Sequence, residues 1–349
     1  MKQSRWIALA LVGALSLSTV AAAQDKGGTD DTGPYRVVAN WAKPTKAGWV
    51  VSGAYSAFAE TPNRIYATYV GERDPATGGP GPNAPPPRVE RHMVVIYDGT
   101  GKVIDDWKQC DSMFVAPHYI TQSPYDPDKN VWVVDRDGSR IVKFSNDGKR
   151  VLMVLGEKRV EKADATHFGR PAAIAFMPDG SFYVADGYVN RRIAKFDKNG
   201  KFLLQWGSAG SGPGQFAAQG QVHSIAIDGD HKIYVGDRGN RRVQIFDENG
   251  KFLDMWPIRR PLDVLMAGDQ HLWVSDLDTS RILEYDLNGK YLYGWGTGGS
   301  RPGNFACAHS ITVDSERNFY IGECFGGRVQ KFQPKPNADP AKVIVPPQV

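Results

Sequence analysis

Three of the seven histidines in this 349-residue chain stand near the start of similar apolar segments, "PHYI", "VHSI" and "AHSI". They are His118, His223 and His309. Imidazole is a good ligand for zinc and other transition metals, and three protein ligands with an open fourth position describe a catalytic metal site. A single histidine of this kind is more often a structural or solvated residue. The chemistry therefore depends on whether the fold brings the three together.

One pattern recurs six times along the chain. Each copy reads as four short β-strands separated by turns such as "NG" and "DG". The copies begin at or near Tyr55, His118, Ala172, His223, Leu262 and His309. Repeats of about 40 to 50 residues with four strands each predict an all-β six-bladed β-propeller, because a ring of such sheets buries the faces that one sheet exposes.

The two ends of the chain are predicted to share the last blade. The final copy lacks a clear fourth strand, whereas "YRVVANW" at residues 35–41 resembles the fourth strand of the other copies. An N-terminal strand in that place would remove two open sheet edges. The propeller is expected over residues 35–345, after a flexible segment at 24–34. Residues 72–88, rich in Pro and Gly, are expected to form a loop inserted in the first blade.

The copies align on the residue that ends the second strand. His223 lies 14 residues before Asp237, and His309 lies 14 before Glu323. His118 lies 17 residues before its acid, which fits extra turn residues. The first strand of a propeller blade is innermost, so histidines on every second blade are related by about 120° and converge in the channel. The remaining histidines are predicted to be surface residues: His92, His167, His231 and His271.

The N-terminus and the charge indicate where the protein acts. Residues 1–23 contain cations, an apolar run and small residues at Ala21 and Ala23, as in a secretory signal peptide. No later segment is long and apolar enough to span a bilayer. We therefore expect a secreted or periplasmic protein. The net charge of +4 falls to +2 without Lys2 and Arg5, which argues against nucleic acid as the main partner.

Three cysteines in an exported chain allow one disulfide. Cys307 lies two residues before His309 and has two possible roles: it approaches the metal, or it pairs with Cys324. If the "DSER" turn joins its strands symmetrically, Val313 faces Asn318 and the two cysteines face each other.

These motifs resemble those of the NHL-repeat propellers typified by peptidyl-α-hydroxyglycine α-amidating lyase. The resemblance covers roughly residues 49–332 and is most specific in the three histidine segments and in "YVADGYVNRRI" from Tyr183. It implies that a catalytic zinc is bound by His118, His223 and His309, and that Tyr188 is the base. The substrate it implies is a carbinolamide, N–C(OH), which such lyases cleave into an amide and an aldehyde acid. Iron, copper, nickel or manganese would also suit imidazole ligands.

The chain departs from this family at two places. The family's substrate-binding arginine after the second strand of the first blade corresponds to Val70 in this chain. Arg73, or Arg136 and Arg238 on the predicted active face, are candidates for that role. The alternative for Arg136 and Arg238 is an ordinary turn arginine paired with the preceding aspartate. A structural calcium is doubtful, because Ser310 replaces the family's carboxylate after the third histidine.

Three functions remain open from the sequence. The first is a metal-dependent lyase acting on a peptide or small-molecule carbinolamide. The second is a non-catalytic propeller that binds a peptide, glycan or envelope partner. The third is a lactonase-like hydrolase, ranked last because such sites use mainly carboxylate and amide oxygens around calcium. The oligomeric state stays undetermined.

Overall fold

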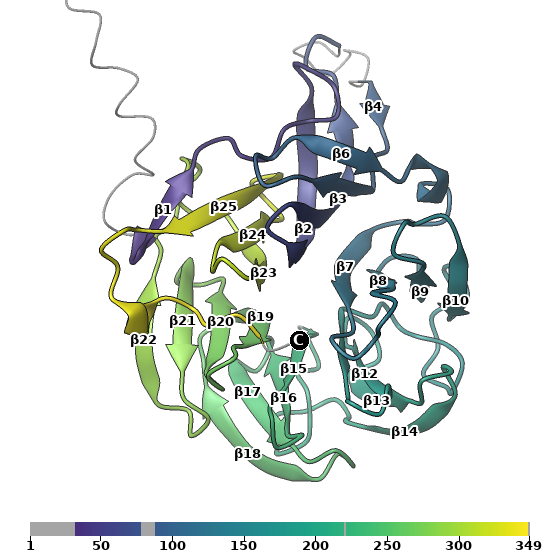
Figure 1. The fold of residues 1–349 in the computed structure, drawn as a ribbon. Helices are drawn as coiled ribbons and strands as arrows, with labels where there is room; N and C mark the ends of the chain where they lie inside the picture. Colours follow the sequence, from purple (N-terminus) through teal and green to yellow (C-terminus); the bar gives the residue numbers. More distant parts are fainter. Residues whose placement is uncertain (1–31, 78–87, 220, 348–349) are drawn as a thin grey trace, which may run out of the picture.

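The computed structural model describes residues 32–77, 88–219 and 221–347. Six sheets are arranged in a ring around a central axis, so the predicted all-β six-bladed propeller is confirmed (Figure 1). Short 3-10 turns lie at Lys108–Cys110 and Pro340–Lys342. No helix that could span a bilayer is found in them. The predicted signal peptide lies outside the described residues.

Each blade has four main strands, which follow one another from the innermost to the outermost. Blade 1 contains β2 (Val50–Thr61), β3 (Arg64–Arg73), β5 (Val94–Tyr97) and β6 (Val103–Asp106), with β4 (Val89–Glu90) beside β3. Blade 2 contains β7 (Pro117–Gln122), β8 (Val131–Asp135), β9 (Arg140–Phe144) and β10 (Val151–Leu155). Blade 3 contains β11 (Ala173–Phe176), β12 (Phe182–Asp186), β13 (Arg192–Phe196) and β14 (Phe202–Trp206). Blade 4 contains β15 (Val222–Ile227), β16 (Ile233–Asp237), β17 (Arg242–Phe246) and β18 (Phe252–Pro257). Blade 5 contains β19 (Pro261–Met266), β20 (Leu272–Asp276), β21 (Arg281–Tyr285) and β22 (Tyr291–Trp295). Blade 6 contains β23 (Ala308–Val313), β24 (Phe319–Glu323), β25 (Arg328–Pro334) and β1 (Tyr35–Val38).

The N-terminal strand closes the last blade, as predicted. β1 pairs antiparallel with β25, and Figure 1 shows the purple β1 beside the yellow β25. Tyr35 is fully buried, with its ring 5.1 Å from Trp295 and 5.6 Å from Phe319. Its hydroxyl accepts a hydrogen bond from the Ile344 backbone N–H at 3.0 Å. The residues at the two ends of the propeller are therefore joined through one side chain.

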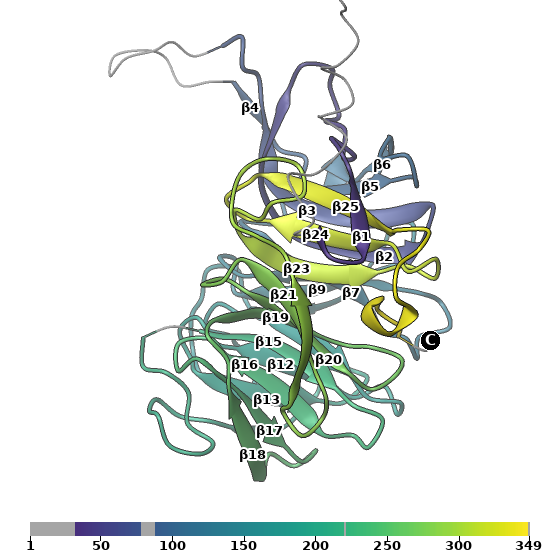
Figure 2. The ribbon, with the colours of Figure 1, turned by 90° about the vertical axis from the view of Figure 1, so that its left-hand side faces the viewer.

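The first blade has a long extension. β2 and β3 remain paired as far as Val50 and Arg73, and β4 adds a further pairing beyond the other blades (Figure 2). The predicted inserted loop at 72–88 therefore begins with two strand residues. Its residues 78–87 lie outside the described part of the chain.

A disulfide joins the start of the first strand of blade 6 to the end of its second strand. The bond links Cys307 to Cys324, whose Cα atoms are 5.6 Å apart, while Cys110 is free and buried. Of the two roles considered for Cys307, the structure therefore shows pairing with Cys324.

The strand register that leads to this pairing differs from the symmetric one. Val313 faces Phe319, so the prediction that it faces Asn318 is wrong by one residue. A bulge between Ala308 and Ser310 adds one residue to β23. Beyond this bulge the register shifts by one residue, so Cys307 is opposite Cys324 after all.

We predict that Tyr35→Ala lowers the free energy of unfolding by about 3 to 5 kcal/mol, because it removes a buried aromatic ring that joins the chain ends. Arg36→Ala is the matched control, since Arg36 lies on the same strand but contacts Gln333 at the surface. Its effect should stay within about 0.5 kcal/mol in denaturant unfolding curves. Equal losses for both variants would contradict closure through Tyr35.

We predict that the unfolded, unreduced protein has one reactive thiol and the reduced protein three. Replacing both bonded cysteines with serine should lower the unfolding free energy by about 3 kcal/mol, because the bond closes a loop across a separation of 17 residues. Thiol titration and denaturant unfolding are the measurements. Three thiols without reduction would disprove the bond.

Candidate metal centre

A β-bulge marks the same position in five of the six blades. There the first strand has one residue more than its partner, and the extra residues are Tyr55, His118, His223, Leu262 and His309. In blade 3 the equivalent Ala172 precedes β11 and donates its N–H to the Ala185 carbonyl at 2.8 Å. A bulge residue has no cross-strand partner, so its side chain can turn out of the sheet. The six residues that align in the sequence repeat therefore occupy equivalent positions in the six blades.

The three histidines at this position converge in the channel. Their ring centroids are 5.0 Å apart for His118 and His223, 4.6 Å for His118 and His309, and 4.9 Å for His223 and His309. One nitrogen from each lies within 4.8 Å of the others, and all three side chains are buried. They form a nearly equilateral group.

Each imidazole is held by a backbone carbonyl of the next blade. Nδ1 of His118 lies 2.8 Å from the carbonyl oxygen of Ala172, and Nδ1 of His223 lies 2.5 Å from that of Leu262. Nδ1 of His309 lies 2.7 Å from the carbonyl oxygen of Tyr55. A carbonyl can only accept, so each Nδ1 carries the proton. Each Nε2 is therefore unprotonated and has the lone pair that a metal ligand needs, as in many histidine metal sites.

Burial keeps these imidazoles neutral. It lowers the pKa of His118 and His223 well below 6.5, and nearby charge on Arg136 and Arg238 lowers it further. Burial also lowers the pKa of His309 to about 3. Metal ligation requires neutral imidazole, so the group is ready to bind near neutral pH.

The spacing of the rings fits one metal ion. With a metal about 2.0 to 2.1 Å from each Nε2, ring centroids would lie about 4.5 to 5.3 Å apart for angles of roughly 90° to 110°. The observed 4.6 to 5.0 Å falls within this range. The three-histidine group can therefore hold a metal ion.

Tyr188 reaches the same group from the loop between β12 and β13. Its hydroxyl oxygen lies 3.0 Å from Nε2 of His118 and 3.0 Å from Nε2 of His223. Both nitrogens are acceptors, so the phenol donates its one proton to either. The structure thus brings the sequence-predicted tyrosine to the sequence-predicted ligands.

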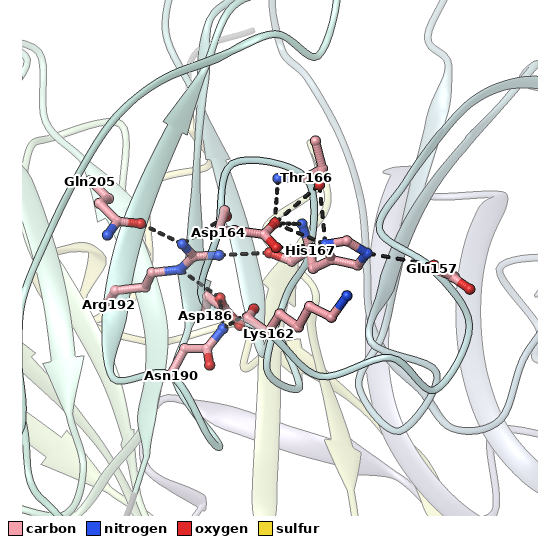
Figure 3. A network of polar contacts seen from close by, with 9 residues as sticks. All are labelled: Glu157, Lys162, Asp164, Thr166, His167, Asp186, Asn190, Arg192 and Gln205. Atoms are coloured by element: carbon pink, nitrogen blue, oxygen red, sulfur yellow. Dashed lines mark hydrogen bonds and ion pairs between the residues drawn. The ribbon is translucent and has the colours of Figure 1, made fainter.

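A buried ion pair fixes the loop that carries Tyr188. Figure 3 shows Arg192 beside Asp186, with Nε 2.8 Å from the carboxylate, and Asn190 donating to the same carboxylate at 2.7 Å. Arg192 also donates to the backbone of Asp164 and His167, which precede the blade. The loop is therefore tied at both of its ends.

Two of the three candidate arginines lie beside Tyr188. The Arg136 guanidinium carbon is 5.1 Å from the Tyr55 ring centroid and 5.2 Å from that of Tyr188. The Arg238 carbon is 5.7 Å from the Tyr188 ring, and its Nε is buried with no hydrogen-bond partner in the described structure. Burial lowers the pKa of Arg238. Arg136 also pairs with Asp137, at 2.8 Å.

Arg73 lies elsewhere. It is exposed at the end of β3, four residues beyond Tyr69, which is level with the histidines. That separation is about 13 Å along an extended strand. The structure therefore brings Arg136 and Arg238, but not Arg73, to the histidine group.

Tyr55 is a site residue that the sequence did not single out. Its ring centroid is 5.6 Å from that of His118 and 5.5 Å from that of His309. The signal was present, because Tyr55 occupies the same repeat position as the histidines. Ser310 has a structural contact: its hydroxyl accepts the Ala57 N–H of the next blade at 3.0 Å.

The prediction that the other four histidines are surface residues is wrong for His92. Its side chain is fully buried, with Nδ1 2.7 Å from Asp106 and Nε2 3.6 Å from Glu90. The acids that satisfy it come from other strands, which a local pattern cannot reveal. His231 is exposed, and His167 and His271 are partly exposed.

The fold and site define a six-bladed β-propeller with a candidate metal centre in its channel. A protein-family model described as a 6-bladed β-propeller matches residues 160–253. A gluconolactonase from Xanthomonas campestris has the same fold, with a TM-score of 0.57 over 90% of this chain and 93% of that one, at 14% identity.

The sequence is similar to amidating enzymes. Peptidyl-glycine α-amidating monooxygenase B of Xenopus laevis is 35% identical over 158 residues, which is 44% of this chain and 17% of that protein. Peptidyl-α-hydroxyglycine α-amidating lyase 1 of Drosophila melanogaster is 36% identical over 121 residues, 34% of this chain and 21% of that protein. The matched part thus spans about a fifth or less of these relatives. The resemblance found in the motifs is confirmed.

We predict that protein purified without a histidine tag contains about one equivalent of a transition metal. His118→Ala, His223→Ala and His309→Ala should each lose it, because two imidazoles bind a divalent metal far more weakly than three. His231→Ala, at an exposed turn, is the control and should keep it. Elemental analysis is the measurement, and full metal content in all three variants would refute the site.

Proposed function

We propose that this protein is a metal-dependent lyase that cleaves a carbinolamide into an amide and an aldehyde acid. The observation that carries the proposal is the Tyr188 hydroxyl, 3.0 Å from Nε2 of both His118 and His223. A phenol that can exchange a proton with the substrate, beside a metal-binding group, is the arrangement that this reaction needs. The similarity to proteins named as amidating lyases supports it.

Zinc is the proposed metal, held by His118, His223 and His309. When bound, it would act as a Lewis acid toward the hydroxyl or carboxylate oxygen of the substrate. Three neutral nitrogen ligands with room for a further ligand are typical of catalytic zinc.

Tyr188 is proposed as the general base. The guanidinium carbons of Arg136 and Arg238 lie 5.2 Å and 5.7 Å from its ring centroid. The phenolate takes the proton of the substrate hydroxyl. As the carbon–oxygen double bond forms, the carbon–nitrogen bond breaks, and the nitrogen receives the proton that Tyr188 holds. Atoms and charge balance without another reactant.

The two arginines are proposed to bind the substrate carboxylate. Guanidinium groups match carboxylate geometry, and the unpartnered Arg238 Nε is a buried donor directed at no protein acceptor among the described residues. The substrate class is then an acyl-NH–CH(OH)–COO⁻ compound, either a peptide or a small molecule.

A secreted or periplasmic location is proposed as well. It is supported by the signal-peptide pattern of residues 1–23 and by the Cys307–Cys324 bond, since such bonds persist mainly in oxidising compartments.

We predict that Tyr188→Phe lowers kcat for N-benzoyl-α-hydroxyglycine by about 100-fold or more, because general-base catalysis typically contributes 10² to 10⁴. Metal content should be unchanged, and glyoxylate release is the measurement. Tyr125→Phe, an exposed tyrosine on the opposite face, should behave like the wild type. Full activity of Tyr188→Phe, or of metal-free protein, would refute the proposed chemistry and favour a non-catalytic propeller.

A further inference from the structure

Equivalent positions on the rim of the channel carry polar side chains on one side and apolar side chains on the other. The loops after the second strands lie at the face where the inner strands begin, because paired strands are antiparallel. At the first or second residue after the acid that ends the second strand in blades 2 to 6, and directly after the equivalent Tyr69 inside β3 of blade 1, three consecutive blades carry polar residues and the other three carry apolar ones. Blades 2, 3 and 4 have Arg136, Tyr188 and Arg238, whereas blades 5, 6 and 1 have Leu277, Phe325 and Val70.

Phe325 is the most exposed large apolar side chain in the described residues, at 77%. It occupies in blade 6 the position that Tyr188 occupies in blade 3, two residues after the end of the second strand. The two blades are three apart in a ring of six, so their loops lie about 180° apart around the axis. Phe325 and Tyr188 therefore belong to opposite sides of the same channel mouth.

The loop that bears Phe325 is fixed on both sides. The preceding Cys324 is bonded to Cys307, and Arg328 pairs with Glu323 across the loop. Gly327 has a φ of +61°, and a Cβ there would lie 2.8 Å from the Val51 carbonyl oxygen of blade 1. The exposed ring is thus presented by a constrained turn.

The contacts continue from this loop to the histidines. Gly327 also lies against the backbone of Gly53, and a Cβ at Gly53 would be 2.7 Å from the Val70 side chain and 3.9 Å from the Tyr55 ring. The Tyr55 ring in turn lies 5.5 Å from that of His309. Val70 and Tyr55 therefore lie beside Gly53, which is next to the turn that carries Phe325, and Tyr55 borders the candidate metal centre.

We propose that Phe325, Val70 and Tyr55 form an apolar subsite for the acyl group of the substrate. This inference rests on the proposed function and names the substrate class more closely. The substrate has a carboxylate that binds at Arg136 and Arg238 and, across the channel, an aromatic or large aliphatic group that covers Phe325.

The test compares two ligands that differ only in their apolar group, N-benzoylglycine and N-acetylglycine. Neither has the hydroxyl needed for cleavage, so calorimetry on metal-loaded protein measures binding alone. The wild type should bind the benzoyl compound about tenfold or more tightly, because a phenyl ring buries far more apolar area than a methyl group.

Phe325→Ala should reduce this preference to about threefold or less, without changing N-acetylglycine binding or metal content. Tyr125→Ala is the matched control: it removes an aromatic ring that is 49% exposed on the opposite face, and the preference should remain. Because Phe325 is exposed, its replacement should not affect folding, which the thermal midpoint checks.

The outcomes separate the subsite from the reaction. A preference that survives Phe325→Ala, or a wild type with no preference, overturns the subsite even if N-benzoyl-α-hydroxyglycine is cleaved. A preference that is lost in Phe325→Ala supports the subsite even if no cleavage occurs, in which case only the proposed lyase activity fails.

Discussion

Each channel histidine depends on a hydrogen bond that crosses a blade boundary. The Nδ1–H groups of His118, His223 and His309 donate to carbonyls of blades 3, 5 and 1. This bond sets both the tautomer and the ring orientation, and so directs Nε2 into the channel. Because three donors and three acceptors involve all six blades, the metal-binding group exists only in the complete ring.

Several of the interactions that hold the ring and the site together lie at the boundary between blades 6 and 1. There β1 completes the last sheet, His309 donates to Tyr55, and Ser310 accepts from Ala57. The disulfide at Cys307 adds a covalent link two residues before the histidine. The contacts that close the ring and those that position the third histidine thus involve the same residues. The bulge at His309 turns the imidazole inward and also brings the two cysteines opposite each other.

The site is asymmetric although the fold is nearly symmetric. Equivalent positions of the repeat carry a tyrosine and two cations on one side of the channel and Leu277, Phe325 and Val70 on the other. Tyr188 can approach two imidazoles because the pair of Asp186 and Arg192 holds its loop, which is a scaffold feature that recurs in blade 4 with Asp237 and Arg242. The ion pairs that recur in the repeat hold the loops in place, and the residues that differ between equivalent loops provide the groups that could bind or react with a substrate.

The sequence alone determined the propeller, its N-terminal closure and the trio of histidines, because a repeat encodes these by local pattern and symmetry. It left open which arginines reach the site, and it did not reveal the burial of His92 or the place of Tyr55. The position facing Val313 differed from the predicted one by a single residue, because bulges have no clear local signature. Only the tertiary structure decided these points, since each depends on distances between strands that the local pattern does not specify.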